Sequence, residues 1–132
     1  RFAITSAIDR DAINELAFGG ATAATGVTPA GLPDSCVATD LPSAQRDVAA
    51  AKAVIDGVGG LELNLFVYTD EPVLAQIAQV MQQNLAEIGV TVEIEQVDYA
   101  TYSDRVYGDP ADFDLALSWF AGYAGPAMVT TW

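Results

Sequence analysis

The sequence predicts an α/β domain in which helices pack against a mainly parallel sheet. In three segments apolar residues alternate with polar ones, as in half-buried strands, over residues 61–68, 90–97 and 114–119. Between them, segments 73–88 and 99–107 carry apolar residues at helical spacing. Strands that alternate with helices in this way favour parallel pairing through right-handed crossovers. The order therefore indicates a βαβαβ-type fold.

The first twenty residues predict two further helices. Residues 1–8 have helical spacing with no cap or turn before them, so we expect the chain to be cut from something longer. Asp9 is a typical N-cap for the second helix, and Gly19-Gly20 is expected to end it. The shared apolar face of that helix comprises Ile13, Leu16 and Ala17.

A long loop and a third helix are expected next. Residues 21–42 hold prolines and glycines that oppose regular structure, and ordered loops of this length are usually functional or packed on another domain. Asp47 is expected to cap a helix over residues 48–55. Its inward side chains would be Ala51, Val54, Ile55 and Val58.

Alternation also predicts which side chains face the core. In the first strand one face comprises Leu61, Leu63, Leu65 and Val67, and the other comprises Glu62, Asn64 and Phe66. The helix over 73–88 is expected to begin at Pro72 and end at Gly89, with a stripe of Val73, Ile77, Val80, Met81, Leu85 and Ile88. The third strand would turn inward Phe113, Leu115, Leu117 and Trp119.

Size and charge limit the function classes. The chain has 132 residues, 52% of them hydrophobic, which suits one domain with a substantial core, so we expect residues 1–132 to form a single domain. Asp and Glu number 18 against 5 Lys and Arg, and this net charge of -13 argues against nucleic acid or an anionic membrane as a partner. Because the acidic residues are spread along the chain, a solubilising surface or adaptation to salt is favoured over a cation site.

The residue types of this sequence give little support for an enzyme or a metal-binding protein. The sequence contains no histidine, so the commonest metal ligand and general base is absent. No nucleophile stands beside a base, and we expect neither enzymatic activity nor a cofactor. Cys36 is the single cysteine, so it either pairs elsewhere in a longer parent or is a packed thiol. No run approaches the ~18 apolar residues of a membrane span, and any export signal is expected outside this chain.

Two sets of neighbouring acidic residues are interpreted as solvent-exposed surface rather than as binding or catalytic sites. Asp109, Asp112 and Asp114 are close in sequence, but they lack the spacing of an EF-hand loop, so a solvated turn is the stronger interpretation. Glu93 and Glu95 share the polar face of one predicted strand. A glycosidase needs two carboxylates that flank a bond, so this pair is also interpreted as a solvated face.

The carboxyl ends of the predicted strands are the candidate ligand site, because open α/β sheets bind ligands there. Aromatic side chains at this edge offer stacking surfaces for a sugar ring or a peptide side chain. Trp119 shares the inward alternation of its strand, so a place in the core is an equal alternative for it. The candidate ligand-binding residues are Tyr68, Thr69, Trp119, Phe120, Ala121, Gly122 and Tyr123, with Asp98 and Tyr99 at the same edge.

Five segments, taken in order, resemble one known family: residues 7–13, 20–31, 47–59, 83–90 and 112–116. The chain is similar to much of the second lobe of the extracytoplasmic solute-binding proteins, family 5, of peptide-type ABC importers. The resemblance implies one lobe of a two-lobe, type II periplasmic-binding-protein-like clamp. It also implies capture of a peptide-like or oligosaccharide solute and delivery to an ABC permease, by a periplasmic protein or a cell-surface lipoprotein. The alternative is a ligand-sensing domain of a regulatory protein built on the same clamp.

The resemblance also bears on specificity. Peptide-binding relatives commonly place an Asp at the position of Gly122, where it pairs with the amino terminus of the peptide. Gly122 has no carboxylate, and Gly125 likewise stands where relatives are often acidic. A buried ammonium without a partner costs several kcal/mol. We therefore expect a ligand without an obligatory free amine, such as an oligosaccharide or a blocked peptide.

Overall fold

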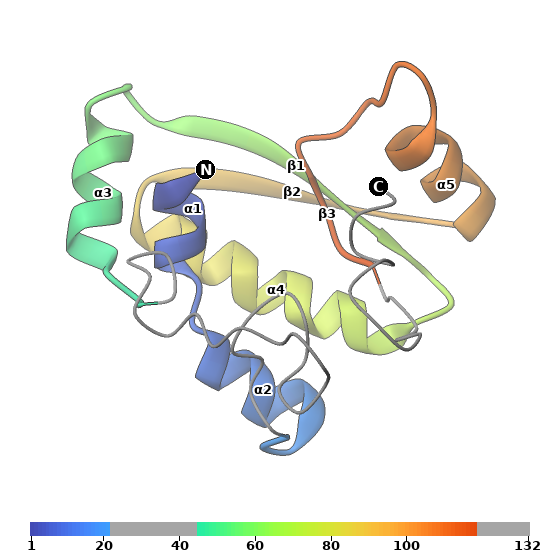
Figure 1. Ribbon diagram of the computed structural model, residues 1–132, viewed down its shortest axis with the longest axis horizontal. Coiled ribbons are helices and arrows are strands. Elements are labelled where there is room, and N and C mark those ends of the chain that lie inside the picture. The colour runs from blue at the N-terminus through green and yellow to red at the C-terminus, as the bar shows by residue number, and fades with distance from the viewer. Residues whose placement is uncertain (22–44, 119–132) are drawn as a thin grey trace, which may run out of the picture.

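The computed structural model describes residues 1–21 and 45–118 (Figure 1). Most of the expected loop 21–42, with Cys36, and the expected segment 119–123 lie outside these residues. The elements are α1 (Phe2–Ala7), α2 (Arg10–Phe18), α3 (Val48–Asp56), β1 (Leu61–Tyr68), α4 (Pro72–Glu87), β2 (Val90–Val97), α5 (Tyr99–Tyr107) and β3 (Leu115–Ala116). From β1 to β3 strands and helices alternate, and the predicted order is confirmed.

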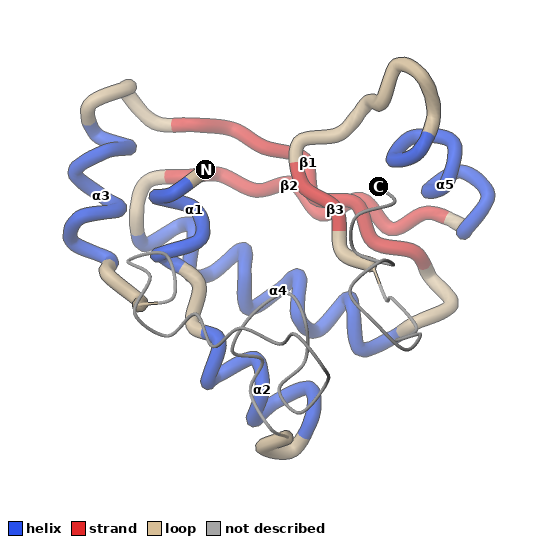
Figure 2. Tube along the Cα trace, viewed as in Figure 1, coloured by secondary structure: helices blue, strands red, loops and turns tan. Residues whose placement is uncertain are grey.

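The sheet is parallel and has the order β2-β1-β3, so the first strand lies in its centre (Figure 2). β1 and β2 pair along their whole length, from Leu61 opposite Val90 to Tyr68 opposite Val97. β3 is shorter than the predicted strand 114–119, because only Leu115–Ala116 joins the ladder. One further hydrogen bond, from the Leu117 N–H to the Phe66 carbonyl at 3.0 Å, extends the contact by a residue.

One face of the sheet is covered by α4, which runs beneath β1 and β2 in Figure 1. As predicted, its Ile77 and Leu85 are buried, whereas Val73, Val80 and Met81 are only half-buried. The predicted helical stripe missed two of its core side chains, Leu74 and Ala78. The helix gives way to β2 through Gly89, whose φ of 85° is a conformation that side chains disfavour.

The other face is covered at its carboxyl half by α5. By alternation Phe66 shares a face with Glu62 and Asn64, yet Phe66 is buried, with 1% of its surface exposed. The guanidinium of Arg105 lies 5.2 Å from the centre of its ring, and Tyr102 packs against the next alternate residue, Tyr68. A strand covered on both faces has no polar side, which explains the buried run from Leu65 to Tyr68. The amino half of β1 is more open, and Glu62 and Asn64 are exposed.

The amino-terminal helices pack on α3 and α4. Asp9 and Asp47 are the predicted N-caps, and they accept hydrogen bonds of 2.9 Å from the N–H groups of Ala12 and Ala50. Three predicted core residues are in fact mostly exposed: Leu16 at 59%, Val54 at 54% and Val58 at 68%. Within residues 1–21 and 45–118 no element covers these three side chains. Helical periodicity alone therefore predicted more core residues than the structure has. No helix in these ranges is long and apolar enough to cross a membrane.

Polar contacts tie the start of the chain to α4. The buried amide of Asn84 accepts a hydrogen bond from the Asp9 N–H at 2.8 Å. Arg46 donates to the Ala7 carbonyl at 3.1 Å and pairs with Glu87 at 3.2 Å. These contacts connect the junction between α1 and α2, and the segment before α3, to α4.

Candidate functional site

Two of the chain segments predicted to form the ligand edge, around residues 68–69 and 98–99, meet at the carboxyl end of the sheet, and the third, 119–123, lies outside the described residues. Beyond the last paired residues of β1 and β2, the Thr69 N–H donates to the Val97 carbonyl at 2.9 Å. On the other side of β1, Leu117 is bonded to Phe66, so the chain leaves β3 beside the same strand. Tyr68 and Thr69 therefore lie between the start of α5 and the exit of β3. In Figure 1 the end of β1 and α5 are both at the right.

Four aromatic rings form what we call the tyrosine cluster: Tyr68, Tyr99, Tyr102 and Tyr107. Tyr68 meets Tyr102 edge-on with ring centres 5.0 Å apart, and Tyr99 edge-on at 5.4 Å. Tyr99 and Tyr102 are stacked at 6.3 Å, with 18° between their planes. Each such pair contributes ~0.5–1.5 kcal/mol beyond the area it buries.

The cluster has a buried base and an open rim. Tyr102 is 0% exposed and Tyr68 is 8% exposed, whereas Tyr99 is 51% and Tyr107 is 41% exposed. Sequence reasoning missed Tyr102 and Tyr107 as parts of this edge. One signal was available, because Tyr99 and Tyr102 stand three residues apart and share a helix face.

Hydroxyl groups of the cluster reach the exit of β3. The Tyr102 hydroxyl donates to the Leu117 carbonyl at 2.9 Å, and the Tyr107 hydroxyl lies 3.3 Å from the Ser118 hydroxyl. Burial raises the pKa of Tyr102 to about 12, so this hydroxyl keeps its proton at neutral pH. The cluster therefore links α5, β1 and β3 through both ring packing and hydrogen bonds.

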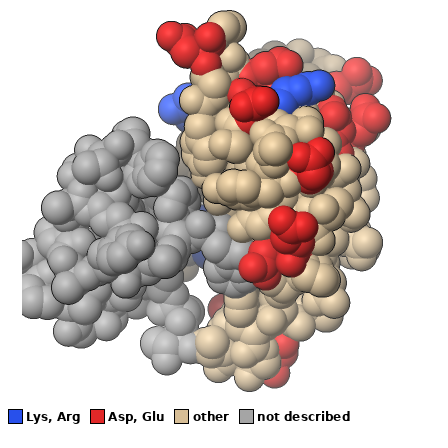
Figure 3. Space-filling model, turned by 90° about the vertical axis from the view of Figure 1, so that its right-hand side faces the viewer, with Lys and Arg blue, Asp and Glu red and all other residues tan. Residues whose placement is uncertain are grey.

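A carboxylate stands at the same edge. Asp98 is the N-cap of α5 and accepts hydrogen bonds from the Thr101 N–H at 3.0 Å and the Thr101 hydroxyl at 2.7 Å. These bonds, the backbone one foremost, lower the pKa of Asp98 from its ordinary value. Figure 3 views this side of the molecule, and acidic side chains are spread over its described surface while basic ones are few. The edge is thus both aromatic and negatively charged.

A small polar groove of about 200 Å³ adjoins the edge, between β1, α5 and the segment before β3. Its charged groups are already engaged, since Arg105 pairs with Asp112 at 3.3 Å and Asp114 accepts from the Asn64 N–H at 2.9 Å. Nowhere in the described part of the chain do three or more acidic or sulfur side chains gather as in a metal site. The groove is therefore a place where the segment before β3 is fastened to the sheet.

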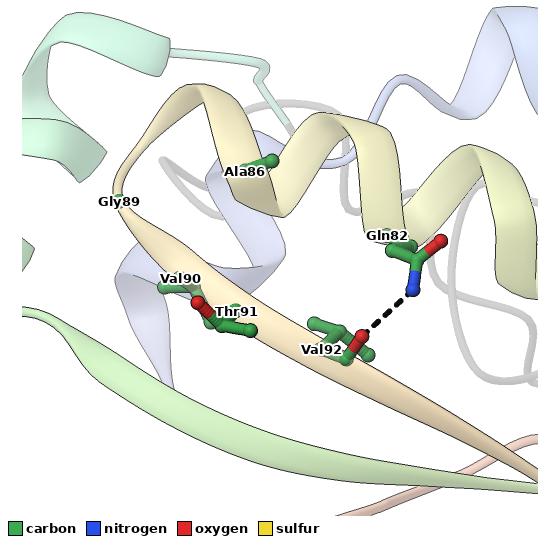
Figure 4. Close-up of a pocket in the computed structure, with 6 residues that line it drawn as sticks. All are labelled: Gln82, Ala86, Gly89, Val90, Thr91 and Val92. Carbon is green, nitrogen blue, oxygen red and sulfur yellow. Dashed lines mark hydrogen bonds between the residues drawn. The ribbon is translucent and has the colours of Figure 1, made fainter.

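A larger groove of about 290 Å³ lies at the opposite, amino end of the sheet (Figure 4). It runs between α4 and the first residues of β2 and is lined by Gln82, Ala86, Gly89, Val90, Thr91 and Val92. The Gln82 side chain donates to the Val92 carbonyl at 2.7 Å, so it satisfies a backbone group of the sheet edge. The amino end of a parallel sheet is not where such folds bind ligands, and we assign this groove a structural role.

The structure places two of the candidate ligand-binding residues, and both are at the carboxyl edge. Thr69 is exposed there, whereas Tyr68 is mostly buried within the tyrosine cluster. The other candidates, Trp119, Phe120, Ala121, Gly122 and Tyr123, lie outside the described residues. Contact of any of the seven with a ligand stays a prediction.

Known proteins resemble this chain over most of its length. A family model described as bacterial extracellular solute-binding proteins, family 5 Middle, matches residues 1–132. A Brucella ovis protein named for peptide binding by an ABC transporter is 29% identical over 131 residues, which cover 92% of this chain and 24% of that protein.

Solved structures show the same fold. The ABC transporter substrate-binding protein CtaP from Listeria monocytogenes superposes with a TM-score of 0.78 at 23% identity, over 89% of this chain and 25% of that one. DppA from Helicobacter pylori, solved with the peptide STSA, gives a TM-score of 0.73 at 25% identity, over 95% of this chain and 24% of that one. The chain therefore spans about a quarter of the length of each protein it is compared with here.

Proposed function

Because the chain belongs to the bacterial extracellular solute-binding proteins of family 5, we propose that it forms part of one lobe of a two-lobe clamp. The clamp captures a peptide-like solute outside the membrane and delivers it to an ABC permease. The observation that carries this proposal is the family match over all of residues 1–132. Since the chain spans about a quarter of its relatives, the second lobe and the hinges belong to the rest of the protein. Binding and release, rather than catalysis, are its function.

In this proposal the ligand contacts the carboxyl edge of the sheet. Two features support that placement: strand ends converge there, and the rim of the tyrosine cluster is open, with Tyr99 at 51% exposure. An exposed tyrosine offers an apolar face and a polar tip, which suits the alternating apolar and amide groups of a peptide. Thr69 and the segment from Trp119 to Tyr123 complete this half of the cleft.

Peptides are the proposed ligand class. The Brucella relative is named for peptide binding and DppA was solved with a peptide, whereas neither description mentions an oligosaccharide. An oligosaccharide ligand therefore has no support among these relatives. Gly122 offers no carboxylate for a ligand ammonium, so the proposed peptide is one that does not depend on a free amino terminus.

Titration calorimetry on the full-length parent protein tests this function. The tetrapeptide STSA, its N-acetylated form and a set of di- to pentapeptides serve as ligands. We expect micromolar or tighter binding of peptides, with N-acetylation leaving the affinity unchanged or improved. Binding that vanishes on N-acetylation would overturn the inference from Gly122, and failure of every peptide would overturn the proposed function.

The isolated segment 1–132 is the matched control. A lobe alone leaves one side of the ligand in water, so its affinity is expected to be far weaker than that of the closed clamp. Full affinity in the segment alone would contradict a two-lobe site.

A further inference from the structure

The exit of β3 is held more firmly than its short ladder suggests. β3 has only Leu115–Ala116 in the sheet, yet the next two residues are both fixed by side chains or strands around them. The Leu117 N–H bonds to Phe66 at 3.0 Å, the Leu117 carbonyl accepts from Tyr102 at 2.9 Å, and the Ser118 hydroxyl lies 3.3 Å from that of Tyr107. The residue that follows is Trp119, the first of the predicted ligand segment.

The anchor for this exit is a buried side chain on a different element. Tyr102 is 0% exposed, and its ring is enclosed by those of Tyr68, Tyr99 and Tyr107. A buried hydroxyl without a partner is costly, so the geometry that satisfies Tyr102 also fixes the Leu117 carbonyl. Since Tyr102 has no exposed surface, it acts on a ligand only through the residues it holds.

We propose that Tyr102, assisted by Tyr107, is a positioning residue: from α5 it holds Leu117 and Ser118 at the exit of β3, and so fixes the shape of the carboxyl edge that the ligand contacts. This inference rests on the proposed function only for its second half. The first half, that α5 holds the exit, concerns the protein without ligand. The two halves are therefore tested by separate measurements.

The first measurement is hydrogen–deuterium exchange on the ligand-free, full-length protein. Tyr102→Phe keeps the ring and removes the donor to Leu117, and Ser118→Ala removes the hydroxyl that lies 3.3 Å from that of Tyr107. Val90→Ala is the matched control, because Val90 is 1% exposed at the far, amino end of the sheet. In Tyr102→Phe, exchange in the peptide containing residues 115–118 is expected to accelerate roughly fivefold or more, as loss of one hydrogen bond allows. Val90→Ala should leave that peptide unchanged.

The second measurement is the peptide affinity of the same variants. We expect the dissociation constant to rise about fivefold in Tyr102→Phe and less in Ser118→Ala, and to stay within twofold of wild type in Val90→Ala. If Tyr102→Phe does not fold, Ser118→Ala carries both measurements, with the same direction expected.

Each result decides something different. Unchanged exchange at residues 115–118 overturns the positioning role whatever the ligand. Faster exchange with unchanged affinity overturns the link to ligand binding while the proposed function stands. A wild-type protein that binds no peptide overturns the proposed function and with it the ligand half of this inference, and the exchange data still decide the other half.

Discussion

Phe66→Ala and Val54→Ala form a pair for which the sequence pattern and the structure give opposite predictions. Alternation puts Phe66 on the same strand face as the polar Glu62 and Asn64, and helical spacing puts Val54 in the core. In the structure Phe66 is 1% exposed beneath α5, whereas Val54 is 54% exposed. Truncating a fully buried Phe costs ~3–5 kcal/mol in free energy of unfolding, and an exposed side chain costs within ~0.5 kcal/mol.

Phe66→Ala also removes the ring beneath the Arg105 guanidinium, 5.2 Å away, which adds ~0.5–1 kcal/mol for a partly exposed cation. Urea unfolding of the full-length protein, followed by circular dichroism and by fluorescence, measures both variants. We expect a large fall in the midpoint for Phe66→Ala and almost none for Val54→Ala. Equal losses, or a larger loss for Val54→Ala, would refute the packing of α5 on the second face of the sheet.

Three further predictions concern caps and protonation. Asp47→Ala removes the side chain that accepts from Ala50 at 2.9 Å, so it should lower the free energy of unfolding by ~1 kcal/mol, measured against an exposed Asp56→Ala control. The pKa of Asp98 is lowered in the fold from its ordinary value of 3.8. The Asp98 carboxylate therefore stabilises the folded protein above pH 3.8, and this stabilisation is lost as the pH falls below that value. Asp98→Asn should therefore lessen the fall in melting temperature between pH 5 and pH 3. The pKa of Tyr102 is raised from 10.0 to about 12, so its contribution is complete below pH 10 and lost as the pH rises to 12. Tyr102→Phe should show a shallower loss of stability over that alkaline range, and an equally steep loss would count against burial of this hydroxyl.

Much of the fold follows from local pattern. The strands 61–68 and 90–97 and the helix 99–107 were predicted with the bounds that the structure has, because alternation, caps and glycine breakers act within a few residues. The caps at Asp9 and Asp47 are similarly local. Parallel pairing followed from the order of the elements alone.

What failed depends on neighbours that are distant in sequence. The burial of Phe66 requires α5 on the second face, and an alternating pattern in one strand does not report a second layer. β3 is shorter than predicted, because the apolar run does not report how many of its residues pair with β1, and only Leu115 and Ala116 do so. Leu16 and Val54 have the right spacing for a core, but within the described residues no element covers them.

Only the part of the candidate site that follows from strand order could be predicted from the sequence, and the part that depends on packing between distant elements could not. Topology alone brings Tyr68, Thr69 and Tyr99 to one edge, since all three follow or end neighbouring parallel strands. The role of Tyr102 depends on how α5 docks, which sets the 2.9 Å bond to Leu117 and is not encoded in any local pattern.

The central claim is that ligand binds at the carboxyl edge of the sheet, and one pair of variants tests it directly. Thr69 and Thr91 are both exposed threonines, at the carboxyl end of β1 and the amino end of β2. Titration calorimetry on the full-length protein compares Thr69→Arg with Thr91→Arg. We expect a loss of peptide affinity of roughly tenfold or more for Thr69→Arg and no change for Thr91→Arg. Unchanged affinity in Thr69→Arg together with a loss in Thr91→Arg would place the ligand at the opposite, amino end of the sheet and exclude a site at the carboxyl edge.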